Sequence, residues 1–348
     1  MHSVEQIVED PNWFLQGINL DSRRLNFVKT SRAALCEASF LDQRFDTKGL
    51  PSTSFGLNEL LDYINREDAP IPAPPRFIFH TAFCCSTLLG RCLDLPGSNL
   101  SLKEPEVLMT LANYRRVGHE LLSKANDAKE VYRLVMLLLF RPFSDNETVV
   151  VKPTNTVNNI ISPLLATHTQ SRAVLLHSDL QSFLISILKK GERGRGFARH
   201  LFNIFLMDSP EAQQLQSKQL IGMTDLQIAA IVWHLQLEHF FDALAKFDSS
   251  IVKSLHCDRL LADSEVILAE LVAHLAMPQL ELNFQAMLAN APLQQNAKMP
   301  DQAFSANDRS KQYQIIESQF SESLAMIGNW AKQLRFKHAY SENIGNRL

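Results

Sequence analysis

Short apolar runs alternate with longer amphipathic stretches along the chain from residue 77 onward. The runs lie at 77–80, 100–102, 149–151, 173–176 and 251–255. The stretches between them carry apolar residues at helical spacing, at 86–95, 105–116, 127–140, 155–166, 180–190, 197–207 and 224–247. Short apolar strands joined through helices form a mostly parallel sheet that is covered on both faces. The pattern therefore predicts an α/β fold, a three-layer α/β/α sandwich around a roughly five-stranded sheet.

The segments before and after this core also carry helical patterns. Residues 31–40 and 57–66 have helical spacing, and a proline-rich stretch at 70–75 separates them from the first strand. Residues 261–277 and 307–334 are typical of closing helices, with a looser connection at 290–306. We expect three segments: a helical N-terminal arm packed on the core (1–75), the α/β core (76–278) and a helical extension of the same domain (279–348).

Composition narrows the class of protein. A chain of 348 residues is long enough for one large α/β domain with additions, or for two small domains. A net charge of −3 argues against non-specific binding to nucleic acid and against a basic membrane-surface protein. The most apolar stretch, 134–140, is too short to span a bilayer. The first residues are partly acidic and lack the apolar segment of a signal peptide.

The cysteine and histidine content favours neither a disulfide framework nor a metal site. The five cysteines are odd in number, and three of them lie between residues 84 and 92. A reducing cytoplasm is the expected setting for such a set. His234 and His239 lie close together but have no further ligand at a suitable spacing. We therefore predict no metal.

The most informative segment is 76–95, RFIFHTAFCCSTLLGRCLDL. Its apolar run, small and hydroxyl residues, and helical spacing indicate a strand, a tight loop and a helix. Such a loop presents unpaired backbone N–H groups, and the helix dipole adds partial positive charge. Ser86 and Thr87 add hydroxyl donors. The order of these elements predicts an anion site at the backbone of 83–87.

This segment resembles the 5′-phosphosulfate-binding loop of the sulfotransferases. The family's loop reads basic, Ser, Gly, Thr, Thr and an apolar pair, and here the same register holds Phe83, Cys84, Cys85, Ser86, Thr87, Leu88 and Leu89. The hydroxyl pair and the apolar pair match, whereas Phe83 replaces the basic residue and Cys85 replaces the glycine. The nucleotide-triphosphatase motif G-x-x-x-x-G-K-S/T is absent.

Polar residues follow most of the predicted strands. They are His80, then Lys103 and Glu104, then Lys152, and then His177, Ser178 and Asp179. Because ligands bind at the carboxyl ends of parallel strands, these residues share one predicted edge of the sheet. Polar residues also end strands without any function. Two lysines placed just before prolines, however, suit a phosphate or sulfate clamp. Lys103-Glu104-Pro105 and Lys152-Pro153 are each similar to a lysine–proline element of the sulfotransferases.

The resemblance extends to a second binding segment, RAVLLHSDLQSFLISILKKG. The family's pattern for the 3′-phosphate is an arginine and, eight residues later, a serine; here these positions hold Ser178 and Ser186. A basic, glycine-rich stretch that we expect to form a loop could supply the missing cation with Lys189, Lys190, Arg193 and Arg195. That stretch could equally be a solvated helix end. Trp233 could stack on the adenine, as aromatic residues do in the family, or pack in the core.

A strand at 251–255 followed by Asp258, Leu260 and Leu261 also looks like the family, so that the resemblance covers about residues 76–278. It implies transfer of a sulfuryl group from 3′-phosphoadenosine 5′-phosphosulfate to an unknown small-molecule hydroxyl or amine acceptor, without a metal. The amides of 83–87 would hold the 5′ end. Lys152 or Lys103 would neutralise the bridging oxygen, and Glu104, or less favourably His80, would be the general base.

Two other interpretations stay open. Cys85 and Arg91 have the C-x₅-R spacing of cysteine-dependent phosphatases, although Leu88 and Leu89 between them fit a buried helix better. The chain could also be a non-catalytic nucleotide-binding or scaffold member of the fold, because Phe83 and Ser178 are what loss of function would leave. Lysines that converge on loop 82–87 would favour transfer chemistry, and lysines turned to solvent would favour the scaffold. The sequence predicts neither the acceptor nor the oligomeric state.

Overall fold

The computed structural model describes residues 2–215, 222–277, 286–287, 295–296, 299–303 and 306–348. Its central sheet has five strands in the order β5-β6-β4-β7-β8, and every neighbouring pair is parallel. These strands are β4 (Arg76–His80), β5 (Asn99–Lys103), β6 (Thr148–Lys152), β7 (Arg172–His177) and β8 (Val252–His256). Each one coincides with a predicted apolar run. The predicted fold class is therefore confirmed.

Helices join the strands and complete the chain. They are α4 (Ser86–Cys92), α5 (Glu106–Arg116), α6 (Glu120–Ser123), α7 (Ala125–Leu139), the 3-10 helix η1 (Asn155–Ile160), α8 (Ile161–Leu165), α9 (Leu180–Lys189), α10 (Gly191–Leu206), α11 (Pro210–Gln213), α13 (Asp225–Lys246), α14 (Cys257–Ala262), α15 (Ser264–His274) and α17 (Ala306–Ala331). A short hairpin of β9 (Gln295–Asn296) and β10 (Met299–Ala303) precedes α17. The rest of the predicted connection at 290–306 lies largely outside the described residues.

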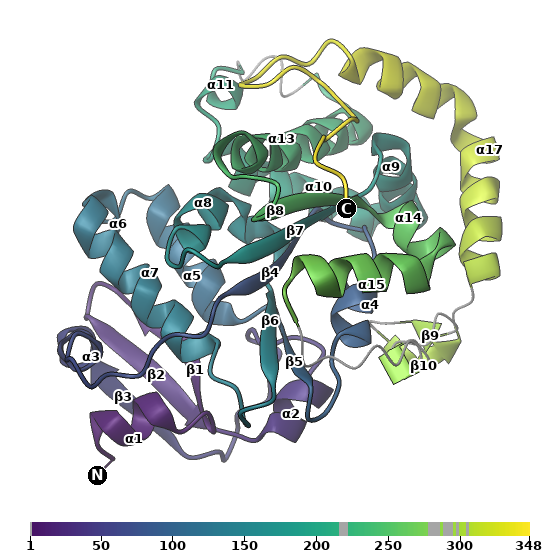
Figure 1. The fold of residues 1–348 in the computed structure, drawn as a ribbon. Helices are drawn as coiled ribbons and strands as arrows, with labels where there is room; N and C mark the ends of the chain where they lie inside the picture. Colours follow the sequence, from purple (N-terminus) through teal and green to yellow (C-terminus); the bar gives the residue numbers. More distant parts are fainter. Residues whose placement is uncertain (1, 216–221, 278–285, 288–294, 297–298, 304–305) are drawn as a thin grey trace.

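Alternating side chains of the strands divide the core into two layers. Ile78 and Val174 lie in one hydrophobic cluster with residues of α4, α14 and α15. Phe77, Phe79 and Leu175 face the other side, in a cluster with α7, α8, α9 and α13. Because side chains of a strand point alternately to opposite faces, the sheet is buried on both. Figure 1 shows α4 and α15 in front of the sheet and α5, α7 and α8 on its other side.

The N-terminal segment is not the helical arm that the sequence predicts. The expected helices are present as α2 (Arg32–Glu37) and α3 (Leu57–Ile64), after a short α1 (Val4–Glu9). Between them runs a separate antiparallel sheet of β1 (Trp13–Asn19), β2 (Arg24–Lys29) and β3 (Ser52–Gly56). Its buried side chains, Leu25 and Phe27 among them, belong to the same cluster as the core beneath α7. The predicted helices are thus present, but the strands were missed: β1 and β2 form a hairpin, and β3 joins β2 from more than twenty residues later in the chain.

The connections place the ligand-binding edge of the sheet at β4. The chain leaves β4 toward β5 on one side, and it later crosses from β6 to β7 on the other side of β4. In open α/β sheets this change of direction opens a crevice at the carboxyl ends of the strands. None of the five cysteines forms a disulfide in this structure. None of the helices within the described residues combines the length and apolarity needed to cross a membrane.

Candidate functional site

The loop between β4 and α4 has an unusual backbone. Phe83 and Cys85 both have a φ of 63°, and α4 starts directly afterwards at Ser86. Left-handed residues that alternate with right-handed ones turn successive N–H groups toward one point, which is how anion-binding nests form. Non-glycine residues with positive φ cost about 1–3 kcal/mol and cluster at functional sites. The expected strand–loop–helix, with its helix from Ser86, is confirmed.

Cys85 explains one departure from the sulfotransferase pattern. It occupies the position where the family carries glycine, and it has the left-handed conformation that glycine adopts without strain. The chain keeps the backbone shape at this position although it has replaced the residue that favours it.

Buried hydrogen bonds hold this loop in place. Thr81 donates its amide to Leu176 O of β7 at 3.0 Å, and Ala82 donates its amide to Gln236 Oε1 of α13 at 3.1 Å. The Cys84 thiol donates to Thr81 O at 2.8 Å, and burial raises its pKa to about 12. Cys84 is therefore a structural thiol and not a nucleophile.

Phe83 packs between helices and cannot supply the positive charge of the basic residue that the sulfotransferase loop carries at this position. Its ring packs against Phe183 of α9 and Phe197 of α10, at centroid distances of 5.7 and 5.5 Å. Lys190 lies over the same ring, with its Nζ 5.5 Å from the centroid. The residue that replaces the family's basic residue thus anchors the loop to two helices, and it brings a lysine near the loop by a cation–π contact.

Lys152, Glu104 and His80 form one buried cluster. Lys152 Nζ lies 2.6 Å from Glu104 Oε1 and 3.5 Å from His80 Nε2, and the Lys152 side chain is fully buried. A Cβ built on Gly90 of α4 would lie 3.6 Å from Lys152 Cδ, so the helix that follows the loop rests on the lysine stem. The structure therefore brings Lys152, Glu104 and His80 together, as the sequence predicts.

Glu104 is strained and ion-paired on two sides. Its φ is 58°, and its second carboxylate oxygen accepts a hydrogen bond from Arg44 Nη2 at 3.1 Å. Burial alone would raise the pKa of the Glu104 carboxyl, but the charges of Lys152 and its neighbours outweigh burial and bring the pKa below its ordinary value of 4.5. Burial also lowers the pKa of Lys152, against the opposing effect of Glu104. Glu104 is ionised, and Arg44 of the N-terminal segment closes its outer side.

This ion pair makes stability depend on pH. Because the pKa of Glu104 is depressed in the folded state, its contribution to the free energy of unfolding is complete above pH 4.5 and is lost as the pH falls through the lower folded value. Denaturant titrations from about pH 7 to about pH 3 should show that wild type has a larger free energy of unfolding than Glu104→Gln at neutral pH. This difference should disappear as the pH falls below the ordinary pKa of a glutamate. A difference between the two proteins that stays constant over the whole range would contradict this ion pair.

Several buried polar atoms point to a ligand at the same edge of the sheet. His80 Nδ1 donates to Thr81 O at 2.8 Å, which leaves Nε2 facing Lys152 Nζ at 3.5 Å. Among the residues that the structure describes, Thr81 Oγ1, Ser178 Oγ and Asn158 Oδ1 are buried without a hydrogen-bond partner. Such groups are costly unless a water or ligand satisfies them.

Lys103 does not take part in this cluster, contrary to the prediction that it is a catalytic candidate. It pairs in register with Lys152 on the neighbouring strand, and its stem also lies under Gly90. Its ammonium turns away, to Asp94 Oδ2 at 3.0 Å and to Cys36 O at 2.8 Å. The nearest carboxylate decides where a buried lysine points. Lys103 therefore ties the core to α2 of the N-terminal segment.

The predicted 3′-phosphate segment is only partly available. Ser186 Oγ lies 2.5 Å from the hydroxyl of Tyr313, a residue of α17. The expected loop 189–195 is wrong: α9 runs to Lys189, and α10 begins at Gly191, which has a φ of 55°. Gly194 serves packing, because a Cβ there would lie 2.2 Å from Ile187 O.

The basic side chains of this segment are divided between two surroundings. Arg195 lies 3.4 Å from Asp225 of α13 in an ion pair. Lys189, Lys190 and Arg193 are exposed at the junction of α9 and α10. Of these three cations, Lys190 makes the cation–π contact with Phe83.

Ser178 and Trp233 are core residues. Trp233 is 1% exposed, its Nε1 donates to Ser178 O at 3.0 Å, and Tyr340 covers its ring at 5.6 Å between centroids. Stacking of Trp233 on an adenine is therefore wrong for this arrangement, and the packing alternative holds. Ser178 is likewise fully buried.

The phosphatase interpretation is not supported. Ser86–Cys92 is helical, so Arg91 lies about 9 Å along the helix axis from Cys85. Its guanidinium lies 3.3 Å from Ser39 Oγ instead of returning to the loop. A phosphatase loop must bring both groups to one anion.

In the part of the chain that the structure describes, one group of side chains could hold a metal by proximity. His256, Cys257 and Asp258 have ligand atoms within 4.8 Å of one another. His256 Nδ1 already accepts the Asp258 amide at 3.3 Å at the start of α14, where the helix dipole disfavours a cation. The expectation of no metal stays a prediction.

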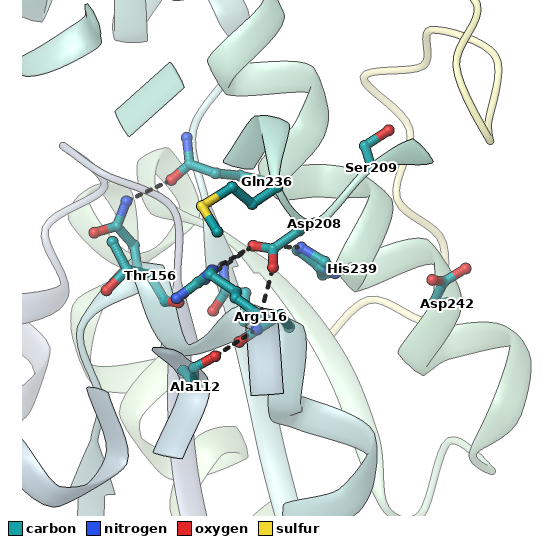
Figure 2. A network of polar contacts seen from close by, with 12 residues as sticks. Ala112, Arg116, Thr156, Asp208, Ser209, Gln236, His239 and Asp242 are labelled. Atoms are coloured by element: carbon teal, nitrogen blue, oxygen red, sulfur yellow. Dashed lines mark hydrogen bonds and ion pairs between the residues drawn. The ribbon is translucent and has the colours of Figure 1, made fainter. Parts of the chain in front are cut away.

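The polar network behind the loop was not predicted from the sequence. Gln236 of α13 and Asn155 of η1 are hydrogen-bonded at 2.8 Å. Nearby, Arg116 of α5 forms a buried ion pair with Asp208 at 2.8 Å, and His239 lies 3.8 Å from the same carboxylate. Figure 2 shows these groups gathered between α5, η1 and α13. A glutamine amid the apolar residues of α13 was the available signal.

Comparisons with known proteins give weak matches. No protein-family model and no curated protein matches the chain. Among solved structures it is similar to the sulfotransferase domain from the curacin biosynthetic pathway, at 16% identity and a TM-score of 0.40 over 72% of this chain and 99% of that one. It is similar to a sulfotransferase from Mycobacterium tuberculosis, at 16% identity and a TM-score of 0.41, over 76% of this chain and 82% of that one. It is also similar to the sulfotransferase domain of a Synechococcus olefin synthase, at 12% identity and a TM-score of 0.41, over 77% of this chain and 98% of that one.

The family that the sequence motifs resemble is the family of these structures. At such low TM-scores the similarity adds nothing to the topology described above. The case for a function therefore depends on the site itself.

Proposed function

We propose that the protein transfers a sulfuryl group from 3′-phosphoadenosine 5′-phosphosulfate to the hydroxyl or amine of a small-molecule acceptor. One observation carries this proposal: the fully buried Lys152 lies under the helix that follows a loop with two left-handed residues, and it is paired with Glu104. A nest of amides binds an anion, and a lysine beside it neutralises charge that develops during transfer. The motif resemblance supplies the identity of the donor. A protein that works in a reducing compartment, the cytoplasm, fits the five free thiols.

The roles follow from the chemistry of the step. The acceptor oxygen or nitrogen bonds to sulfur while the bond from sulfur to the phosphate oxygen breaks, which leaves adenosine 3′,5′-bisphosphate. Lys152 donates to the oxygen that gains negative charge, and the amides of 83–87 with Ser86 and Thr87 hold the 5′-phosphate. The acceptor's proton passes to one of the two groups that flank Lys152, the Glu104 carboxylate or His80 Nε2. The depressed pKa of Glu104 weakens that carboxylate as a base.

The nucleotide end is where a second candidate function gains support. Tyr313 already satisfies Ser186, and Tyr340 covers Trp233. These contacts occupy two residues expected to bind the nucleotide, and they favour a non-catalytic member of the fold. A catalytic protein needs cations elsewhere to hold the 3′-phosphate. The three exposed cations at the α9–α10 junction, Lys189, Lys190 and Arg193, are the remaining candidates.

Discrimination between nucleotides tests both candidates. Calorimetry is expected to show wild type binding adenosine 3′,5′-bisphosphate at least tenfold more tightly than adenosine 5′-phosphate, because charge-assisted contacts contribute about 1.5–3 kcal/mol. The variant Lys189→Ala, Lys190→Ala, Arg193→Ala should lose that preference. A control with the same change in net charge, Lys124→Ala, Lys129→Ala, Lys332→Ala, removes exposed lysines elsewhere and should keep it. If wild type binds both nucleotides with equal affinity, 3′-phosphoadenosine 5′-phosphosulfate is not the donor, and the non-catalytic scaffold becomes the favoured function.

A further inference from the structure

We infer that Gln236 is the positioning residue that sets the anion loop against the catalytic lysine. Gln236 lies on α13, is fully buried, and neither faces solvent nor reaches Lys152 by a hydrogen bond of its own. Its amide oxygen joins the loop after β4 to the segment that follows β6. What this inference says about nucleotide binding rests on the proposed function, whereas what it says about the loop does not.

The first segment is the loop. Gln236 Oε1 accepts the Ala82 amide at 3.1 Å, directly before the left-handed Phe83. Because a backbone amide that loses a buried acceptor stays unsatisfied, this bond opposes any movement that would straighten the loop. The strained φ values at 83 and 85 need such constraints, since strained residues persist only where their surroundings hold them.

The second segment follows the catalytic lysine. Asn155 begins η1, three residues after Lys152, and its Nδ2 donates to the same Gln236 oxygen at 2.8 Å. One acceptor thus receives a donor from each side of the site. These two bonds tie the loop to the segment that follows the lysine, beside the bond that Asn158 Nδ2 donates to His80 O at 3.2 Å.

The amide group itself is held in one orientation. Gln236 Nε2 donates to Val232 O one turn earlier on α13 at 3.1 Å, which leaves the oxygen to face Ala82 and Asn155. All polar atoms of this buried side chain are accordingly used, and the cost of burying it is offset. Figure 2 shows the Gln236 side chain extending from its helix, and its oxygen accepts the bond from Asn155 Nδ2.

Thiol labelling measures the position of the loop without any ligand. In wild type, Cys84 is buried with its thiol on Thr81 O, while Cys85 is partly exposed. Gln236→Leu keeps the side-chain size and removes the acceptor, and Gln236→Asn keeps the amide but shortens its reach. Both are expected to raise the rate at which iodoacetamide alkylates Cys84 by about tenfold or more, as local opening becomes easier. Hydrogen exchange at the Ala82 amide should accelerate in parallel.

Two further variants separate positioning from general loss of stability. Gln236→Glu at about pH 6 should restore protection, because burial keeps the carboxyl neutral and a neutral carboxyl offers the same acceptor and donor. His274→Leu removes a comparable bond, from His274 Nε2 to Ala173 O at 2.9 Å, at the amino end of β7. It should lower stability while leaving Cys84 protected.

The outcomes decide between the two claims. Unchanged Cys84 labelling in Gln236→Leu, or equal labelling in His274→Leu, would overturn the role of Gln236. Faster labelling confined to the Gln236 variants supports it, even if wild type fails to bind adenosine 3′,5′-bisphosphate, in which case only the proposed function fails. Where wild type binds, Gln236→Leu should weaken binding about tenfold and Gln236→Glu should restore it.

Discussion

Replacing Lys152 by methionine is expected to lower the rate of donor turnover by about 10²–10³-fold. A single preorganised cation at the developing charge contributes this much in many enzymes. Methionine fills the buried space of the lysine stem but cannot donate a hydrogen bond. The assay is release of adenosine 3′,5′-bisphosphate from 3′-phosphoadenosine 5′-phosphosulfate, with water as the acceptor, so that it needs no knowledge of the natural substrate.

Lys103→Met is the matched control for this experiment. Lys103 and Lys152 pair in register on neighbouring strands, both are buried, and each forms an ion pair with a carboxylate. Removing either lysine takes one cation from a carboxylate that an arginine also contacts, Arg44 at Glu104 and Arg32 at Asp94, and is expected to destabilise both variants. The rate per folded molecule should fall only in Lys152→Met. An equal loss in both variants would mean that the ion pair of Lys152 is structural.

Thr87→Asp is expected to abolish binding of adenosine 3′,5′-bisphosphate, with a loss of about two orders of magnitude or more. Thr87 is the second residue of α4 and is 5% exposed. A carboxylate about 5 Å from a bound phosphate costs roughly 3 kcal/mol at an effective dielectric constant near 20. The fold should survive, because an acidic residue in the first turn of a helix is favourable.

Two neutral variants provide the controls. Thr87→Asn has the shape of the aspartate without its charge, and Thr87→Ala removes one hydroxyl but leaves the amides. Both should weaken binding by about tenfold or less in calorimetry. If Thr87→Asp binds the nucleotide as tightly as wild type, loop 83–87 is not the anion site.

The central sheet was predictable because its strands are buried on both faces and therefore read as continuous apolar runs. The loop was predictable because small and hydroxyl residues interrupt the pattern between a strand and Ser86. The N-terminal sheet was harder to predict. Its strand β2 pairs with β3, which lies more than twenty residues later, so the sequence around β2 does not contain its partner. Pairing between distant segments is where local patterns are weakest.

The sequence correctly predicted which residues lie at the carboxyl ends of the strands, but it did not predict which groups their side chains contact. Lys103 and Lys152 occupy equivalent positions, yet Asp94 draws one ammonium away and Glu104 holds the other at the loop. The glycines near residue 191 suggested a loop, whereas Gly194 allows α10 to pack closely on Ile187 O. Gln236 reaches the loop across 154 residues of sequence, a contact that no local pattern encodes.

The most direct test of the proposed function is a crystal structure of the protein with adenosine 3′,5′-bisphosphate, supported by calorimetry of the same complex. The account predicts that the 5′-phosphate lies on the amides of 83–87 within reach of Lys152, and that the 3′-phosphate lies toward the α9–α10 junction. A protein that does not bind the nucleotide, or that binds it away from loop 83–87, would contradict the account.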